Sequence, residues 1–169
     1  MAVRSTVTSS MTISSTVKSR LRFTLDSNLL VYSVASEEGA RHEAAVEIVN
    51  RAVDADCWLT LQSLSEFYSV SRRKNVPRER AAAQVENWLV AFPHIAVSAT
   101  AIRTALSHHL AGRASYWDAL LVTTAAEAGC TLVLTEDMAD GAMLGGVRIH
   151  KPFTPDGVLS ELTRQLLDL

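Results

Sequence analysis

This chain of 169 residues lacks several features that would assign a protein at once to a class. No apolar run approaches the roughly 20 residues that a helix needs to cross a bilayer, so we expect no membrane span. Two cysteines, Cys57 and Cys130, and five scattered histidines show no spacing typical of a zinc site. We expect the cysteines to be buried free thiols and the histidines to lie at the surface. The formal net charge of −2 excludes a bulk polycation that coats nucleic acid, but it permits a local basic patch.

The first twenty residues are rich in Ser and Thr, and they lack the continuous apolar segment of a secretory signal. We therefore expect a disordered tail over residues 1–20 and a cytoplasmic protein. The length of the remainder suits one domain with a sizeable core. We place this domain at residues 21–153 and expect a helical extension over residues 154–169.

Short apolar segments alternate with segments of helical periodicity along the rest of the chain. Strands are expected at residues 23–25, 57–61, 95–97, 131–135 and 147–150. Helices are expected at residues 27–32, 41–53, 63–75, 78–91, 100–110, 115–128 and 156–167. This alternation predicts an α/β fold, with a short, mostly parallel sheet of four to five strands covered by helices on both faces.

Four carboxylates stand where these segments begin or end. Asp26 and Asp137 follow two predicted strands, whereas Glu66 and Asp118 lie in the first turns of two predicted helices. Ligands gather at the carboxyl ends of parallel strands, so we expect the four acids to converge there. Like charges gathered in a low-dielectric pocket repel one another unless a cation holds them. A hard divalent cation with oxygen ligands, Mg²⁺ or Mn²⁺, is the natural candidate.

Each acid also has a purely structural interpretation. Glu66 follows Ser63 at the spacing of a capping box, and Asp118 has the same relation to an earlier serine. Asp26 fits an N-cap, and Asp137 fits a cap of the segment that follows it. Four independent caps would not need this order, with two of them at strand ends. We therefore favour a common site.

The segments around the four acids resemble the motifs of PIN-domain ribonucleases. In chain order, the similarity is carried by Leu25-Asp26-Ser27-Asn28-Leu29-Leu30-Val31-Tyr32, Ser65-Glu66-Phe67-Tyr68, Tyr116-Trp117-Asp118-Ala119-Leu120-Leu121 and Thr135-Glu136-Asp137-Met138. It covers about residues 23–152 and is greatest to the VapC-like toxins of bacterial toxin–antitoxin pairs. The resemblance implies a PIN-like three-layer α/β/α fold and a metal-dependent endoribonuclease. Its metal ligands, for one or two Mg²⁺ or Mn²⁺ ions, would be Asp26, Glu66, Asp118 and Asp137.

Other polar residues near these motifs are candidates for supporting roles. Asn28 and Thr135 are placed to hold a ligand carboxylate or a metal-bound water. Asp140 is a further candidate acid. Glu136 lies between a strand end and Asp137, and we expect it to face solvent.

An RNA substrate requires cations near the acids, because phosphate contacts dominate affinity. We prefer Arg113 as a phosphate contact because it shortly precedes Asp118 in the sequence. Tyr116 and Trp117 have the chemistry to stack a base, although Trp117 fits a core position better. A second source of positive charge is the basic run Arg72, Arg73 and Lys74.

The resemblance also implies partners and leaves one alternative open. It implies an RNA substrate (tRNA, mRNA or rRNA), a homodimer, and a cognate antitoxin received by the helices between residues 41 and 91. A phosphatase of the haloacid-dehalogenase type is disfavoured, because that chemistry needs a second Asp where Asn28 stands. A catalytically silent PIN-like module that binds RNA or protein remains the alternative. The four intact acids argue against it, since an unused acid cluster destabilises its fold.

Overall fold

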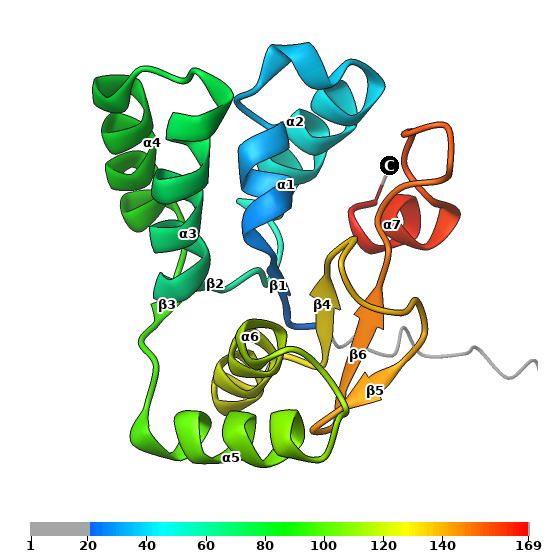
Figure 1. Ribbon diagram of the computed structural model, residues 1–169. Helices are drawn as coiled ribbons and strands as arrows, with labels where there is room; N and C mark the ends of the chain where they lie inside the picture. The colour runs from blue at the N-terminus through cyan, green and yellow to red at the C-terminus, as the bar shows by residue number, and fades with distance from the viewer. Residues whose placement is uncertain (1–20, 169) are drawn as a thin grey trace, which may run out of the picture.

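In the computed structural model, which describes residues 21–168, short strands alternate with helices (Figure 1). The strands are β1 (Phe23–Leu25), β2 (Leu59–Thr60), β3 (His94–Ile95), β4 (Leu132–Leu134), β5 (Met143–Leu144) and β6 (Val147–His150). The helices are α1 (Ser27–Tyr32), α2 (Ala40–Ala52), α3 (Leu61–Ser71), α4 (Arg78–Ala91), α5 (Ala99–Leu110), α6 (Tyr116–Glu127) and α7 (Glu161–Leu166). Two 3-10 helices follow α1 and α3, namely η1 (Ser36–Glu38) and η2 (Arg72–Lys74). The tail predicted at residues 1–20 lies outside the described residues.

The main sheet has the strand order β1-β4-β6-β5. Its first three strands are parallel, whereas β5 pairs antiparallel with β6. A second parallel pair, β2 and β3, is connected to β1 by a bridge between Phe23 and Cys57. The predicted short and mostly parallel sheet is confirmed. The prediction missed β5, which lies between glycines in the stretch 141–146 rather than in an apolar run of its own.

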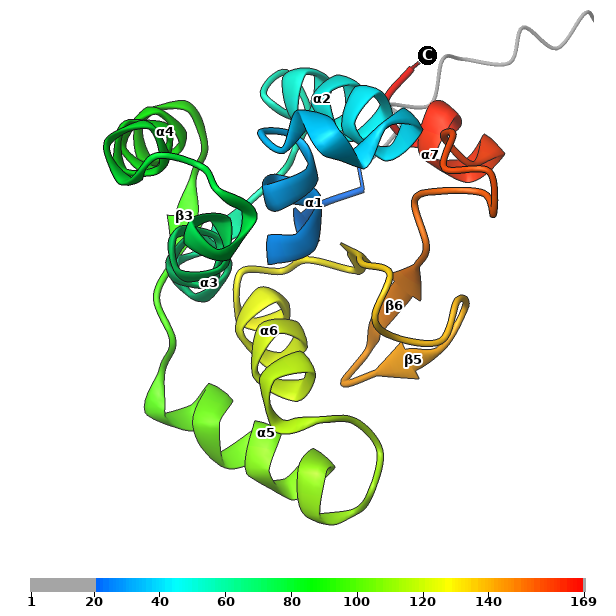
Figure 2. The same ribbon diagram turned by 45° about the horizontal axis from the view of Figure 1, so that its top comes forward.

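Helices cover the main sheet on both faces, which gives three layers (Figure 2). The side chains of β4 show how the sheet divides the core. Leu132 and Leu134 belong to the hydrophobic cluster shared with α1, α2 and α3, whereas Val133 belongs to the cluster shared with α5 and α6. Successive side chains of a strand point to opposite faces, so a strand buried on both sides is apolar at every position.

Helix α6 lies between α5 and the sheet in the lower layer of Figure 1. Every residue from Ala119 to Ala125 is buried, which is expected for a helix enclosed by other structure on all sides. Thr123 keeps its hydroxyl satisfied there by donating to the carbonyl of Ala119 at 2.8 Å. The helix begins at Tyr116, so the buried residues that follow fix the position of its first turn.

The cysteine prediction is confirmed, since Cys57 and Cys130 are buried free thiols. No helix among residues 21–168 has the length and apolar character that a membrane span requires. Two predicted helices differ from the structure by more than one residue at an end. Helix α3 begins at Leu61 rather than Ser63, because Thr60 caps it by accepting from the Ser63 backbone N–H at 3.0 Å. Helix α7 is shorter than predicted and covers only Glu161–Leu166.

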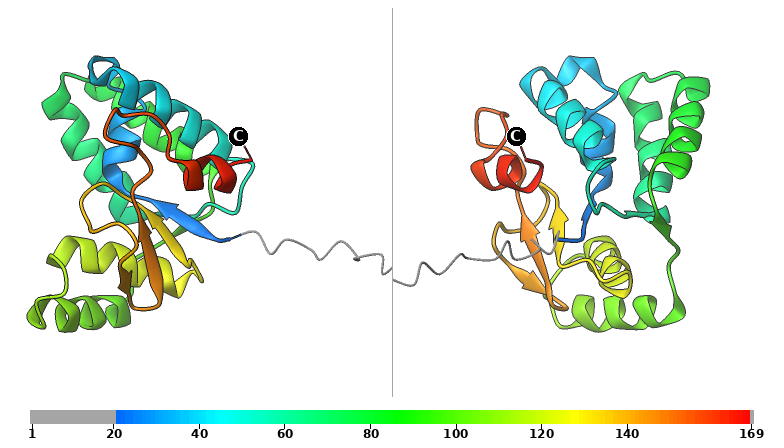
Figure 3. Two further views of the ribbon diagram at one scale, coloured as in Figure 1. Left: turned by 90° about the vertical axis from the view of Figure 1, so that its right-hand side faces the viewer. Right: turned by 180° about the vertical axis from the view of Figure 1, so that it is seen from behind.

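The segment after β6 packs against the domain, and Figure 3 shows α7 next to α2. Leu167 is buried within the same cluster as the residues of α2, and Leu159 packs against that cluster. His150 also anchors this segment, because its Nε2 lies 2.9 Å from Ser160 Oγ and 3.2 Å from Thr163 Oγ1. The expectation that all histidines lie at the surface is therefore wrong for His150, which is buried.

Candidate active site

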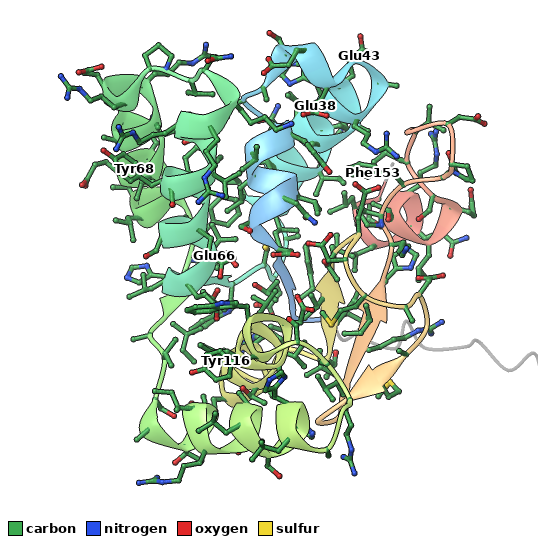
Figure 4. The ribbon with its side chains drawn as sticks, viewed as in Figure 1. Glu38, Glu43, Glu66, Tyr68, Tyr116 and Phe153 are labelled. Carbon is green, nitrogen blue, oxygen red and sulfur yellow. The ribbon has the colours of Figure 1, made fainter. Side chains whose placement is uncertain are left out.

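The four predicted acids line one open cavity of about 820 Å³ at the carboxyl ends of β1 and β4. Asp26 directly follows β1, and Asp137 comes shortly after β4. Glu66 reaches the cavity from α3, and Asp118 from the first turn of α6. Figure 4 labels Glu66 on the side of α3 toward β1, and Tyr116 at the start of α6. Residues separated by more than a hundred positions are thus brought together by the parallel topology.

Asp26 is the most enclosed of these acids, with 6% of its surface exposed. Its Oδ1 accepts from the Ser27 backbone N–H at 2.6 Å, and its Oδ2 accepts from Thr135 Oγ1 at 2.6 Å. Burial raises the pKa of Asp26 to about 6 despite these two hydrogen bonds, and the charges of Asp137 and Glu66 add to the rise. The structural interpretation of Asp26 also holds, since it is the N-cap of α1.

Asp137 depends on two neighbours that were predicted to support the site. Asn28 Nδ2 donates to Asp137 Oδ2 at 3.2 Å. The hydroxyl of Thr135 accepts from the Asp137 backbone N–H at 3.1 Å while it donates to Asp26, so one threonine positions both acids. Burial and then the charge of Asp118 raise the pKa of Asp137, and the Asn28 amide acts in the opposite direction.

Two residues that sequence analysis did not select hold Glu66 in place. Ser27 Oγ donates to Glu66 Oε2 at 3.1 Å, which connects the first acidic motif to the second. Gln62 Nε2 donates to Glu66 Oε1 at 2.9 Å and to the Trp117 carbonyl at 3.1 Å. The position of Gln62, one helical turn before Glu66, is the sequence signal that would have indicated it.

The predicted capping boxes have different outcomes at Glu66 and Asp118. The interpretation of Glu66 is wrong, because α3 begins earlier and Glu66 contacts Ser27 and Gln62 instead. Ser115 does cap α6, accepting from the Asp118 backbone N–H at 3.2 Å. The Ser115 hydroxyl also donates to Asp118 Oδ2 at 2.7 Å, which orients this carboxylate. Capping and a place at the cavity are therefore compatible for Asp118.

The remaining predicted acid, Asp140, does not line the cavity. Its Oδ1 lies 3.0 Å from His150 Nδ1 and accepts from the Lys151 backbone N–H at 2.8 Å. Glu136 was expected in solvent, but it is partly buried and pairs with Arg41 at 3.3 Å. Of the three acids that follow β4, only Asp137 lines the cavity. Glu136 and Asp140 contact other residues.

The candidate cations are also separated by the structure. Arg73 lines the acidic cavity, and together with Arg72 it lines a smaller hollow of about 420 Å³ beside it. Lys74 is engaged by Glu38 at 2.7 Å. Arg113 lies in the turn between α5 and α6 and does not line the cavity, so Arg73 is the predicted cation that lines it.

Trp117 corrects another expectation, because it is not a core residue. Its surface is 60% exposed, and it lines the cavity next to Asp118. Tyr116, by contrast, packs against the cluster formed by α5 and α6. The sequence places both aromatic residues in the first turn of one helix, and only the packing of that helix decides which of them is buried.

The donor set of the cavity suits a hard divalent cation. As they are oriented, no group of three or more His, Cys, Asp or Glu side chains among residues 21–168 already forms a metal site. Four carboxylates nevertheless border the cavity with a single cationic side chain, Arg73, among the described lining residues. Gln62 Oε1, at the cavity, and Asn28 Oδ1, on the amide that contacts Asp137, are buried without a hydrogen-bond partner in the described part of the chain. Carboxylate and amide oxygens are the ligands that Mg²⁺ and Mn²⁺ take, directly or through water.

Comparisons with known proteins establish the family and the fold of the chain. The sequence matches the PIN domain family model over residues 23–139. The chain belongs to the PIN domain family. Its match spans all four acidic positions, so this PIN domain contains Asp26, Glu66, Asp118 and Asp137 within the family region. No curated protein sequence matches the chain.

Solved structures with the same fold include a VapC toxin and two VapBC complexes. Mycobacterium tuberculosis VapC20, a Sarcin-Ricin loop cleaving toxin, is 17% identical with a TM-score of 0.53, over 66% of this chain and 86% of that one. DNA-bound VapBC from Salmonella typhimurium is 18% identical with a TM-score of 0.55, over 77% and 97% of the two chains. VapBC2 from Rickettsia felis, bound to a promoter DNA fragment, is 12% identical with a TM-score of 0.57, over 77% and 98%. At these identities the similarity establishes the fold, and this PIN domain is VapC-like in that respect.

Proposed function

We propose that this protein is a metal-dependent endoribonuclease and the toxin of a toxin–antitoxin pair. The observation that carries the proposal is the convergence of four carboxylates on one cavity in a PIN domain. Uncompensated acids are costly to a fold, and the raised pKa of Asp26 and of Asp137 reflects that cost. Such clusters are typical of functional sites rather than of structural ion pairs.

Asp26, Glu66, Asp118 and Asp137 would hold Mg²⁺ or Mn²⁺. The bound metal would lower the pKa of water, orient it toward phosphorus and stabilise the leaving oxygen. The protein's own contribution is to fix the four carboxylates before the substrate arrives. Each is oriented by at least one side-chain donor, and these donors are Thr135, Asn28, Ser27, Gln62 and Ser115. We assign Asn28 and Thr135 the supporting role and leave Asp140 outside the metal site.

The partners of this activity belong to the same proposal. The RNA backbone would contact Arg73 and Arg72, which line the hollow beside the acidic cavity. A cognate antitoxin and a second copy of the chain are proposed because proteins with this fold include a toxin and two VapBC complexes. Co-expression with the product of a neighbouring small reading frame tests the antitoxin: it should co-purify with this chain and suppress its RNA cleavage.

The direct test is cleavage of a structured RNA pool that includes total tRNA, with Mg²⁺ or Mn²⁺ present. Discrete products should appear and should vanish with EDTA and in Asp118→Asn. A matched control is Asp140→Asn, which removes an acid that lies outside the cavity. Failure of the folded, antitoxin-free protein to cut any RNA would favour the catalytically silent RNA- or protein-binding module.

A further inference from the structure

We infer that Trp117 is the side chain on which an unpaired nucleobase of the RNA stacks, beside the four acids. This inference rests on the proposed function and extends it to the residue that binds the base. It is carried by the exposure of one indole, by its attachment to the acidic cluster, and by the composition of the cavity around it.

The exposure of Trp117 is unusual in this chain. Trp88 is 4% exposed and packs edge to face on Phe67, with the ring centroids 4.7 Å apart. The Trp58 ring is covered by the guanidinium of Arg22 at 4.8 Å. Trp117 is 60% exposed, although the helix residues that follow Asp118 are buried. A large apolar ring kept open at a polar cavity is a surface on which another flat group can stack.

The ring is held in place rather than left free. Tyr116 contacts it edge to face, with centroids 5.3 Å apart and the planes at 65°. The Trp117 carbonyl accepts from Gln62 Nε2, and the same amide donates to Glu66. The next residue, Asp118, is fixed to the N-cap Ser115. The backbone of Trp117 is therefore tied to two of the four acids, and a base stacked on its indole would place its phosphate near them.

The rest of the cavity is suited to a strand of nucleotides. Val97 and Leu121 give it an apolar wall, and Ser69 and Arg73 extend it along α3 and η2. Arg73 lies seven positions after Glu66, which is roughly 10 Å at the helical rise per residue. A strand can then contact the acids with one phosphate and Arg73 with another. Bases inside a duplex are already stacked on each other, so only an unpaired base can reach one indole.

The exposed indole also has the chemistry of a protein contact, because tryptophan is common at interface hot spots. Its position favours RNA. The ring lines the acidic cavity instead of an apolar face, and a protein partner there would have to match four carboxylates with cations. We therefore commit to the nucleobase and treat a protein contact as an outcome of the test.

The test measures binding of a 12-nucleotide unstructured RNA to the Asp118→Asn protein in the presence of Mg²⁺. Binding is detected by the change in tryptophan fluorescence. The chain has three tryptophans, and only Trp117 lies at the cavity, so the RNA should quench the emission and Trp117→Phe should remove most of the quenching. Stacking of one base is worth roughly 5- to 100-fold in affinity, so Trp117→Ala should raise the Kd by that factor. An abasic site scanned along the oligonucleotide should weaken binding at one position and have no further effect in Trp117→Ala.

Salt dependence separates stacking from charge. Arg73→Gln should reduce the slope of log K against log salt by about one, whereas Trp117→Ala should leave the slope unchanged. Leu110→Ala, on the exposed end of α5, is the matched control and should change neither quantity. Circular dichroism and thermal unfolding should show that each variant keeps the fold.

Three results would overturn the inference: unchanged affinity in Trp117→Ala, equal quenching by a duplex of the same sequence, or no position-specific abasic effect. Loss of self-association or of antitoxin capture in Trp117→Ala, with RNA affinity intact, would assign the indole to a protein contact instead. These results are distinct from failure of the proposed function. That failure would be seen as absent RNA cleavage by the wild-type protein, whatever Trp117 does.

Discussion

Asp137 and Asp140 follow the same strand three residues apart, yet the fold treats their charges in opposite ways. Asp140 accepts from the Lys151 backbone N–H and contacts His150, and these hydrogen bonds hold its pKa below the usual range. Asp137 has only the Asn28 amide as a side-chain donor, and burial with the nearby Asp118 raises its pKa. The charged carboxylate of Asp140 therefore stabilises the folded protein. The charged carboxylate of Asp137 is held in the fold at a cost in stability.

The same contrast extends to the regions around the two acids. Around His150, both ring nitrogens have partners, and β6 is fastened to the segment that carries α7. Around the cavity, acids repel one another and two amide oxygens remain without partners among the described residues. Buried polar groups are normally satisfied, so unsatisfied groups gathered in one place mark where a ligand is expected.

The largest expected effect is the difference in RNA cleavage rate between variants of Asp137 and Asp140. Asp137→Asn should lower the rate of RNA cleavage by about 10³-fold or more, since a metal ligand supports several kcal/mol of transition-state stabilisation. Asp140→Asn should keep its rate within about threefold, because the side chain lies outside the cavity. Single-turnover cleavage at saturating Mg²⁺ measures both. Equal losses in the two variants would remove the contrast between them.

The His150→Ala variant tests how much the hydrogen bonds around His150 contribute to the free energy of unfolding. Removing a buried, fully bonded imidazole should cost about 2–4 kcal/mol in the free energy of unfolding. Urea unfolding at neutral pH gives this value, and the RNA cleavage rate per folded molecule should not change. His94→Ala is the control, since His94 is exposed and should change stability by less than about 0.5 kcal/mol. A change of less than about 0.5 kcal/mol in His150→Ala would show that the hydrogen bonds of His150 do not stabilise the packing of α7.

Thr135→Val tests how the acidic region is organised. The variant keeps the shape of the side chain but removes the donor to Asp26 and the acceptor for the Asp137 N–H. Mg²⁺ affinity should fall by about 10- to 100-fold, as measured by calorimetric titration. Thr24→Val is the matched control, because Thr24 is equally buried in β1 and its hydroxyl has no partner among the described residues. Similar Mg²⁺ affinities in both variants would contradict the assigned role.

Asp26→Asn should stabilise the metal-free protein by about 1–3 kcal/mol at pH 8, the range that follows from its raised pKa. The sign follows from proton linkage. The folded protein binds this proton more tightly than the unfolded chain, so wild-type stability should decrease as pH rises from about 4 to about 6 and then stay level. Unfolding of the wild type and the variant with EDTA, across this pH range, measures the difference.

Asp140→Asn provides the opposite sign, because the pKa of Asp140 is lowered in the folded state. The stability that Asp140 contributes is present above the unfolded pKa and is lost as pH falls through the folded pKa. This variant should therefore be less stable than the wild type at pH 8 and should approach it at low pH. The same direction in both variants would show that the two carboxylates are not treated differently.

Sequence alone determined the α/β architecture and the identity of the four acids. Asp26 and Asp137 follow apolar strands, and parallel strands end at a common edge, so their meeting is a consequence of topology. Chain order then identified Glu66 and Asp118 as their partners. Helix ends were less well determined, because Thr60 and Ser63 both have the chemistry of a cap and only the structure shows that Thr60 is used.

Only the tertiary structure decided which neighbours each side chain has. Ser27 reaches Glu66, Asp140 meets His150, Arg73 rather than Arg113 lines the cavity, and Trp117 stays exposed. None of these outcomes follows from local periodicity, since each depends on how elements far apart in the chain pack together. The pattern of residues in a sequence predicts which face of a helix or strand is apolar. Only the packing of the helices and strands determines which residues the side chains of the other face contact.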